Sequence, residues 1–172
     1  MYTFMKLRAL TSSLLLAVVL VPMVAAPASA ATISNSTYRW RLFLEINQVR
    51  RDHGLHALHI APGLRAAAQN HSNDMVNRDY FSHTSPTGST LYRRVVNSGF
   101  TTFGSWGAGE NLAWGTGTYG SPRTTVRMWL ASPEHRANLL SRSWGWVGIG
   151  RRSGRFLGHG GAVVWTVDFA HR

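Results

Sequence analysis

Apolar residues recur at helical spacing near the start of the chain. Within residues 38–53, Leu42, Ile46 and Val49 lie three or four positions apart, which places them on one face of a helix. Gly54 follows at a position where glycine commonly ends a helix. We therefore predict an amphipathic helix over residues 38–53.

A second helical pattern begins at Pro62, because proline is well suited to the first turn of a helix. Its apolar positions and His71 recur every three or four residues until Asp79. Residues 81–88 are rich in serine, threonine, proline and glycine and are expected to form a loop. The further predicted helices are a short one over 90–98 capped by Ser89, one over 124–131, and one that begins at Ser132-Pro133-Glu134 with serine as its N-cap.

The last third of the chain has a different pattern. Valine, tryptophan and phenylalanine are concentrated in residues 146–149 and 162–169, which predicts two antiparallel strands. The glycine- and arginine-rich residues 150–161 between them are expected to form a long hairpin loop. Several helices and a small antiparallel sheet together indicate an α+β domain.

The first thirty residues have the pattern of a signal peptide. Lys6 and Arg8 precede an apolar stretch over residues 14–26, and small residues at 28–30 offer a cleavage site. The apolar stretch is shorter than the ~20 residues that span a bilayer, although a retained membrane anchor is the alternative. We expect a signal peptide at 1–30, a short leader at 31–41 and one domain at 42–172, in a secreted, monomeric protein.

Composition narrows the possible chemistry. The chain has 172 residues, 44% of them hydrophobic and 15% charged, which argues against a disordered protein. It has no cysteine, which excludes thiol nucleophiles, cysteine zinc sites and disulfides. Removing Lys6 and Arg8 with the signal leaves 16 basic residues, all arginine, against seven acidic ones, a balance of +9. Arginine favours bidentate contacts with phosphate and carboxylate, whereas codon bias and solubility are the alternative explanation.

Common catalytic motifs are absent, so the candidate residues are individual histidines and carboxylates. The sequence contains no HExxH, GxSxG or Walker-type motif. We expect His71, on the apolar face of its helix, to be a buried and hydrogen-bonded histidine. Glu110 stands among glycines and tryptophans, where partial burial would require a partner such as histidine or a metal. A structural glutamate that ties loops together is the alternative. The histidines in or near loops that could line a cleft are His83, His135 and His159.

Three motifs appear in a recognisable order, namely FSHTSP at 81–86, GENLA at 109–113 and WLASPEHRANLL at 129–140. Together with WTVDF at 165–169, they closely resemble the bacterial SCP-domain branch of the CAP superfamily. This superfamily also contains the cysteine-rich secretory proteins, antigen 5 and plant pathogenesis-related proteins. The resemblance implies a three-layer α-β-α sandwich with helices on both sides of a small antiparallel sheet.

Family members carry a histidine and glutamate cluster in a central cleft, which in some of them binds zinc or another divalent metal. By position in the motifs, the resemblance implies that His83, Glu110 and His135 belong to this cluster. Two imidazoles and one carboxylate with an open position would suit zinc and lower the pKa of a bound water towards ~7. His135, near a helix N-terminus, would be biased towards its neutral, metal-binding form. The alternative is a metal-free hydrogen-bond cluster that fixes three loops.

The chain departs from the eukaryotic pattern of the family at two positions. Ser132 stands where eukaryotic members have a glutamate. The second histidine of those members aligns with Val164 or with His159, depending on how the final strand is aligned.

These observations lead us to expect a secreted, non-enzymatic module that binds an anionic or amphipathic envelope ligand, either a lipid or an anionic envelope polymer. Nucleic acid is not expected, because no aromatic-basic module motif accompanies the arginines. The rival interpretation is a metal-assisted extracellular hydrolase with Glu110 or a bound hydroxide as base and with His83 and His135 as ligands. Serine hydrolysis by Ser85 beside His83 is a further alternative, but loop chemistry before Pro86 also explains Ser85.

Overall fold

The computed structural model describes residues 34–100 and 102–172, and the predicted signal peptide lies outside them. The described residues belong to one compact unit. Its elements are the helices α1 (Asn35–Asp52), α2 (Pro62–Arg78), α3 (Leu91–Asn97), α4 (Pro122–Ala131) and α5 (Pro133–Leu140), the 3-10 helix η1 (Gly117–Gly120), and the strands β1 (His59–Ile60), β2 (Gly107–Thr116), β3 (Trp146–Phe156) and β4 (His159–His171).

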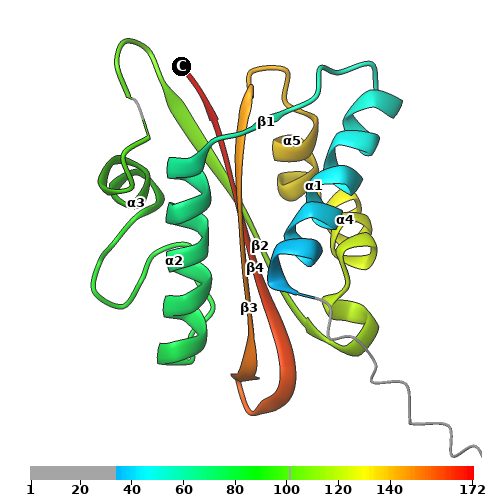
Figure 1. The fold of residues 1–172 in the computed structure, drawn as a ribbon, viewed down its shortest axis with the longest axis vertical. Coiled ribbons are helices and arrows are strands. Elements are labelled where there is room, and N and C mark those ends of the chain that lie inside the picture. Colours follow the sequence, from blue (N-terminus) through cyan, green and yellow to red (C-terminus); the bar gives the residue numbers. More distant parts are fainter. Residues whose placement is uncertain (1–33, 101) are drawn as a thin grey trace, which may run out of the picture. The chain divides into compact units, whose positions relative to one another are not determined.

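The strands form one sheet in the order β1-β3-β4-β2. The short β1 runs parallel to β3, and the other neighbouring pairs are antiparallel. Helices α2 and α3 lie on one side of this sheet, and α1, α4 and α5 lie on the other (Figure 1). The expected α+β fold with three α-β-α layers is therefore confirmed, although the sheet is mixed rather than purely antiparallel.

Alternation along β4 distributes its side chains between the two helical layers. Trp165 and Val167 belong to the core shared with α1 and α4, whereas Ala162 and Val164 belong to the cluster around Met75 of α2. Because successive strand residues point to opposite faces, all even-numbered positions of β4 face the α2 layer. This alternation decides where the polar residues of β4 must lie.

Two glycines in β3 allow α2 to pack directly on the sheet. A Cβ atom at Gly148 would lie 2.0 Å from the backbone carbon of Leu64, and one at Gly150 would lie 2.2 Å from the backbone oxygen of Ala68. Backbone atoms cannot move aside as a flexible side chain can, so neither position accommodates a larger residue. The absence of side chains at these two positions thus sets the distance between α2 and the sheet.

The predicted helices are confirmed with shifted ends. Helix α1 begins at Asn35 after the cap Ser34, so residues 35–41 form its first turns instead of a leader. The cap of α3 is Thr90 rather than Ser89, and its side chain accepts a hydrogen bond from the backbone N–H of Arg93. None of the helices among the described residues is both long and apolar enough to cross a membrane.

The sheet differs more from the expectation. Residues 150–161 are not a long hairpin loop, because β3 and β4 run through most of this range and turn at Leu157 and Gly158. Both turn residues have positive φ, 46° and 83°, as a two-residue hairpin requires. Strands β1 and β2 were not predicted, and β2 supplies one whole edge of the sheet.

A buried arginine joins α1 to the chain that follows α5. Arg50 is 1% exposed, yet no carboxylate accompanies it among the described residues. Its guanidinium instead donates hydrogen bonds to four backbone carbonyls, at 2.9–3.4 Å, namely those of His56, Leu139, Ser141 and Trp144. These contacts satisfy the buried charge with neutral dipoles.

Candidate functional site

The candidate site lies on the edge strand β2, on the face that α2 and α3 cover. Glu110 of β2 stands opposite Asp168 of β4 in the strand register. Paired residues in register project to the same face of a sheet, so the two carboxyl groups lie side by side beneath α2. Both are buried, with Glu110 at 7% and Asp168 at 0% exposure.

Glu110 binds an imidazole and a guanidinium group, one through each carboxylate oxygen. The Nδ1 atom of His83 lies 2.7 Å from Oε1, and Arg94 donates from Nη2 to Oε2, also at 2.7 Å. His83 comes from the loop after α2, whereas Arg94 comes from α3. Three segments that are distant in sequence therefore meet at one carboxylate.

Arg94 also fixes the loop that carries His83. Its Nη1 atom donates to the backbone carbonyls of His83 and Ser89, both at 3.0 Å. Ser85 stabilises the same loop, because its hydroxyl accepts from the backbone N–H of Ser89 at 3.0 Å and pairs with the Thr87 hydroxyl at 2.9 Å. These contacts support the interpretation of Ser85 as a turn residue instead of a nucleophile.

The charges of this cluster shift the pKa values of its members. Burial alone would raise the pKa of Glu110, but the hydrogen bond from His83 and the charge of Arg94 outweigh it, so the net shift is downward. The hydrogen bond to Glu110 raises the pKa of His83 above its usual value, despite partial burial. The pair is therefore an ionised carboxylate and an imidazole that favours its protonated form.

Asp168 behaves in the opposite way. Complete burial, followed by the neighbouring charge of Glu110, raises the pKa of Asp168 well above the ordinary range of an aspartate. Among the described residues, neither of its carboxyl oxygens has a hydrogen-bond partner of normal geometry. Burial thus favours the neutral form of Asp168, next to a Glu110 that favours its ionised form.

His71 of α2 completes the inner wall of the site. Its Nε2 atom lies 4.0 Å from Glu110 Oε2 and 3.0 Å from the backbone oxygen of Ser82. Burial lowers the pKa of His71. The expectation of a buried, hydrogen-bonded histidine at this position is confirmed.

His135 reaches the site from the other helical layer. It lies at the start of α5, where its Nδ1 atom pairs with the Ser132 hydroxyl at 2.8 Å, and its backbone oxygen accepts from Asn111 of β2. Burial and then the nearby His83 lower the pKa of His135. The expected neutral bias is therefore present, but burial is its main cause. Ser132 occupies the N-cap position of α5, yet its side chain makes no capping hydrogen bond to a backbone N–H.

The arrangement does not readily fit a metal bound by His83, Glu110 and His135. No three histidine, aspartate or glutamate side chains in residues 34–100 and 102–172 are placed to hold a metal ion. Both Glu110 oxygens already accept a short hydrogen bond, and the Arg94 guanidinium beside Oε2 would repel a cation bound there. Zinc or another divalent metal at these residues remains a prediction.

His159 lies apart from the cluster. It begins β4 at the hairpin, is exposed, and packs its ring 5.4 Å from the ring of Trp114. Neither position that aligns with the second histidine of eukaryotic members adds a polar group beside Glu110. His159 lies at the hairpin, and Val164 is part of the apolar cluster below α2.

Sequence reasoning missed two members of the site. Arg94 is one of many arginines in the sequence, and nothing in a single sequence pairs it with a glutamate 16 positions away. Asp168 gave a clearer signal, since it is a lone carboxylate inside the apolar segment WTVDF. Buried carboxylates in such segments usually need a polar neighbour, which here is Glu110.

Comparison with known proteins defines the class of protein that this fold and cluster represent. Residues 43–169 match the family model described as CAP, the cysteine-rich secretory protein family. Because the match spans most of the chain, the protein belongs to the CAP family.

Individual relatives agree with this assignment. The chain is 30% identical over 141 residues to the uncharacterized protein YkwD of Bacillus subtilis, covering 82% of this chain and 50% of that protein. Among solved structures, an extracellular protein of Bacillus anthracis that contains an SCP domain matches with a TM-score of 0.65 and 26% identity, over 81% of this chain and 44% of that one. The chain thus spans about half the length of these two relatives.

An outer surface protein of Borrelia burgdorferi shares the fold at closer to full length. It matches with a TM-score of 0.68 and 23% identity, over 81% of this chain and 96% of that protein. The same fold therefore makes up about half of one solved chain and nearly the whole of another.

Proposed function

We propose that the protein is a secreted, non-enzymatic binding module that recognises an anionic or amphipathic ligand of the cell envelope. Secretion is supported by the signal-peptide pattern at residues 1–30 and by relatives described as extracellular and outer surface proteins. In this proposal the exposed His83 ring contacts the ligand, and the arginine-rich surface attracts it.

The observation that carries the proposal is the way in which Glu110 is held. Each carboxylate oxygen accepts a hydrogen bond at 2.7 Å, and these partners lower the pKa of Glu110, which makes it a weaker base. His83 uses Nδ1 for this contact and keeps 60% of its side chain exposed. The protonated ring can therefore offer its Nε2–H to an anion, while Glu110 and Arg94 hold it in place.

A binding titration tests the proposal. The protein is mixed with vesicles containing phosphatidylglycerol, and separately with a purified anionic wall polymer, at pH 6 and pH 9 and over roughly 50–500 mM salt, which screens exposed charges increasingly. We expect the affinity for at least one of them to fall with rising salt and with rising pH, because the raised pKa of His83 extends its charged form to higher pH and that charge is lost as the pH rises through the folded pKa. His83→Gln should remove the pH dependence, and the exposed connector variant His56→Gln should keep it. Affinity that ignores ionic strength would refute the charge argument.

A metal-assisted hydrolase is the second candidate, and the direct contact between His83 and Glu110 favours it. A carboxylate that orients a histidine is common behind a metal ion, where the free ring nitrogen is the ligand. Elemental analysis of protein purified without chelator, together with thermal unfolding with and without zinc, separates the two candidates. Stoichiometric metal, with a rise in Tm that His135→Ala abolishes, would establish the metal site that the hydrolase requires, and the absence of both would remove this candidate.

A further inference from the structure

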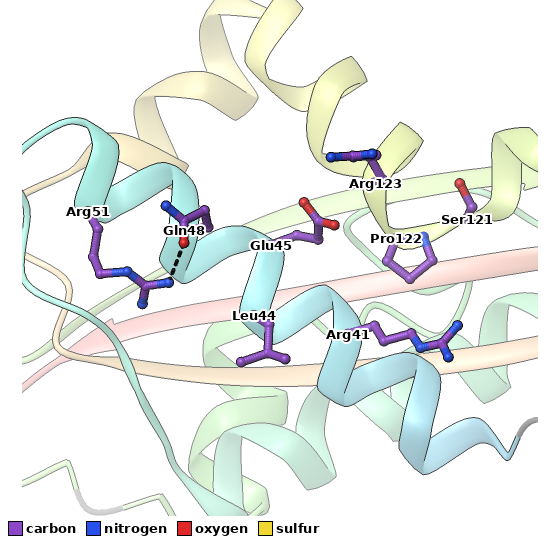
Figure 2. A pocket seen from close by; sticks show the side chains of 8 residues that line it. All are labelled: Arg41, Leu44, Glu45, Gln48, Arg51, Ser121, Pro122 and Arg123. Atoms are coloured by element: carbon purple, nitrogen blue, oxygen red, sulfur yellow. Dashed lines mark hydrogen bonds between the residues drawn. The ribbon is translucent and has the colours of Figure 1, made fainter.

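A second candidate surface lies on the helical layer opposite the Glu110 cluster. A groove of about 640 Å³ runs between α1 and the first turn of α4 (Figure 2). It shares no residue with the Glu110 cluster. Its lining residues are Arg41, Leu44, Glu45, Gln48, Arg51, Ser121, Pro122 and Arg123.

The groove presents its charges along the length of α1. Arg41, Glu45 and Arg51 belong to α1 and line the groove, spread over about 120° of the helix circumference at about 100° per residue. At 1.5 Å per residue, the ten positions from Arg41 to Arg51 extend over ~15 Å. Figure 2 shows Glu45 from α1 and Arg123 from α4 extending into the space between these helices. A ligand that meets all four groups must therefore be extended.

The cations of the groove are not used by the fold. Within residues 34–100 and 102–172, Arg41 and Arg123 make no hydrogen bond or ion pair, and Arg51 binds only the Gln48 side chain, at 2.7 Å. Glu45 also forms no ion pair in this part of the chain. This contrasts with Arg50 and Arg94, whose guanidinium groups are bound on several sides.

The lining indicates which anion fits. Guanidinium groups bind phosphate in a bidentate geometry, and three of them around one carboxylate leave a net charge of +2. The groove contains no aromatic residue on which a nucleobase could stack. Leu44, 45% exposed, is its one exposed aliphatic side chain, which is too little apolar surface for insertion into a lipid bilayer. Glu45 would repel a phosphate but can accept a hydrogen bond from a hydroxyl group.

We propose that this groove binds a linear polyol phosphate polymer, with phosphates at the arginines and a polyol hydroxyl at Glu45. The inference rests on the proposed function: it names the class of the anionic envelope ligand and adds the α1–α4 groove as a second contact surface for it, separate from His83. The polymer lies along α1, so that two of its phosphates meet Arg41 and Arg51 while Arg123 closes the groove from α4.

A matched pair of double variants tests the location. Arg41→Gln/Arg123→Gln removes two groove cations, and Arg152→Gln/Arg155→Gln removes two exposed cations from the β3–β4 hairpin with the same change in net charge. Binding of a synthetic glycerol phosphate oligomer is measured by calorimetry over a range of salt. We expect the groove variant to bind about tenfold more weakly, with a slope of log affinity against log salt that is smaller by about 2. The hairpin variant should change affinity less than about twofold, since it alters only the long-range field. Equal losses in both variants would overturn the assignment.

A single variant tests the role of Glu45. Glu45→Gln should tighten binding of inorganic polyphosphate, which has phosphates but no hydroxyl groups, because a repulsive charge is removed. The same variant should weaken binding of the glycerol phosphate oligomer, or leave it unchanged, because a hydroxyl acceptor is lost. If the substitution tightens both ligands to the same extent, the groove is a general anion site and the polyol assignment is wrong.

Three outcomes separate this inference from the proposed function. If the wild-type protein binds neither polymer nor anionic vesicles, both proposals fail. If it binds the oligomer and the groove variant binds equally well, only the groove assignment fails. If the groove variant loses phosphatidylglycerol vesicles but keeps the oligomer, the groove recognises lipid headgroups and the polymer assignment is wrong.

Discussion

Two arginines illustrate two ways of keeping a guanidinium out of water. Arg50, between α1 and the chain after α5, is surrounded by four backbone carbonyls that never change charge. Arg94, on α3, binds the carboxylate of Glu110, which in turn binds His83 and lies beside Asp168. The first surrounding is neutral at every pH, whereas the second contains three groups that titrate.

This difference indicates which region of the fold should change its stability with pH. Neutral dipoles around Arg50 make a permanent link between two helices, so this region should respond to mutation but not to pH. The Glu110 cluster should respond to both, because its free energy depends on which groups carry a proton. Four substitutions, in decreasing order of expected effect, test this contrast.

Arg50→Met should cause the largest loss of stability. Four backbone carbonyls would lose their donor in a buried setting, and we expect the free energy of unfolding to fall by about 4 kcal/mol. Urea denaturation at pH 5 and pH 8 should give the same loss, and the exposed neighbour Arg51→Met should change stability by less than about 0.5 kcal/mol. A loss that depends strongly on pH would mean that Arg50 is coupled to a titrating group.

Glu110→Gln should cost about 3 kcal/mol at pH 7, because it leaves the Arg94 guanidinium buried without its counter-charge. The pKa of Glu110 is lowered in the fold, so its ionised form stabilises the native state above the unfolded pKa of about 4.5. That contribution disappears as the pH falls through the lower folded pKa. Unfolding curves at pH 3, 5 and 7 should therefore show the wild type and the variant converging only at the acidic end. A constant difference would contradict an ionised Glu110.

Asp168→Asn should have the opposite sign. The pKa of Asp168 is raised in the fold, so the native state resists an ionisation that the unfolded chain undergoes near its ordinary value of 3.8. Wild-type stability is therefore reduced as the pH rises above that value, by up to ~1.4 kcal/mol per pH unit for this one group until the folded pKa is reached. The neutral amide avoids this loss, so the variant should be within about 1 kcal/mol of wild type at pH 3 and gain relative to it towards pH 7. A variant that weakens steadily with pH would show that Asp168 is ionised in the fold.

His83→Gln should have the smallest effect on stability, under about 1 kcal/mol, because the side chain is mostly exposed and its ion pair is screened. The pKa of His83 is raised by Glu110, so its stabilising contribution is present below the unfolded value of 6.5 and disappears as the pH rises through the folded pKa. Thermal unfolding at pH 6 and pH 9 should show a small deficit only at pH 6. A deficit of equal size at both pH values would show that the contact is insensitive to protonation.

Much of the fold could be predicted from the sequence because its helices are strongly marked. Pro62 and Pro133 begin their helices as predicted, and Gly54 follows the end of α1. Strand β2 was missed because GAGENLAWGT contains three glycines and few β-branched residues, so only its pairing with β4 makes it a strand. The arginines and glycines of residues 150–161 suggested a loop for the same reason.

The site was predictable only in part. The motifs that carry His83 and Glu110 indicated both residues, and the structure brings them into direct contact. Arg94 and Asp168 join them through the packing of α3 and the register of β4, which a single sequence does not reveal. His135 is close enough to His83 to affect its charge but forms its hydrogen bond with Ser132.

The strand register also makes the Glu110 cluster a reporter of correct folding. A shift of one residue between β2 and β4 would turn Glu110 towards the apolar core under α1 and leave Arg94 without an acceptor. Misaligned chains would then lack the imidazolium resonance that the Glu110 contact gives His83. Proton NMR of that one ring would therefore distinguish native molecules from slipped ones without any ligand being known.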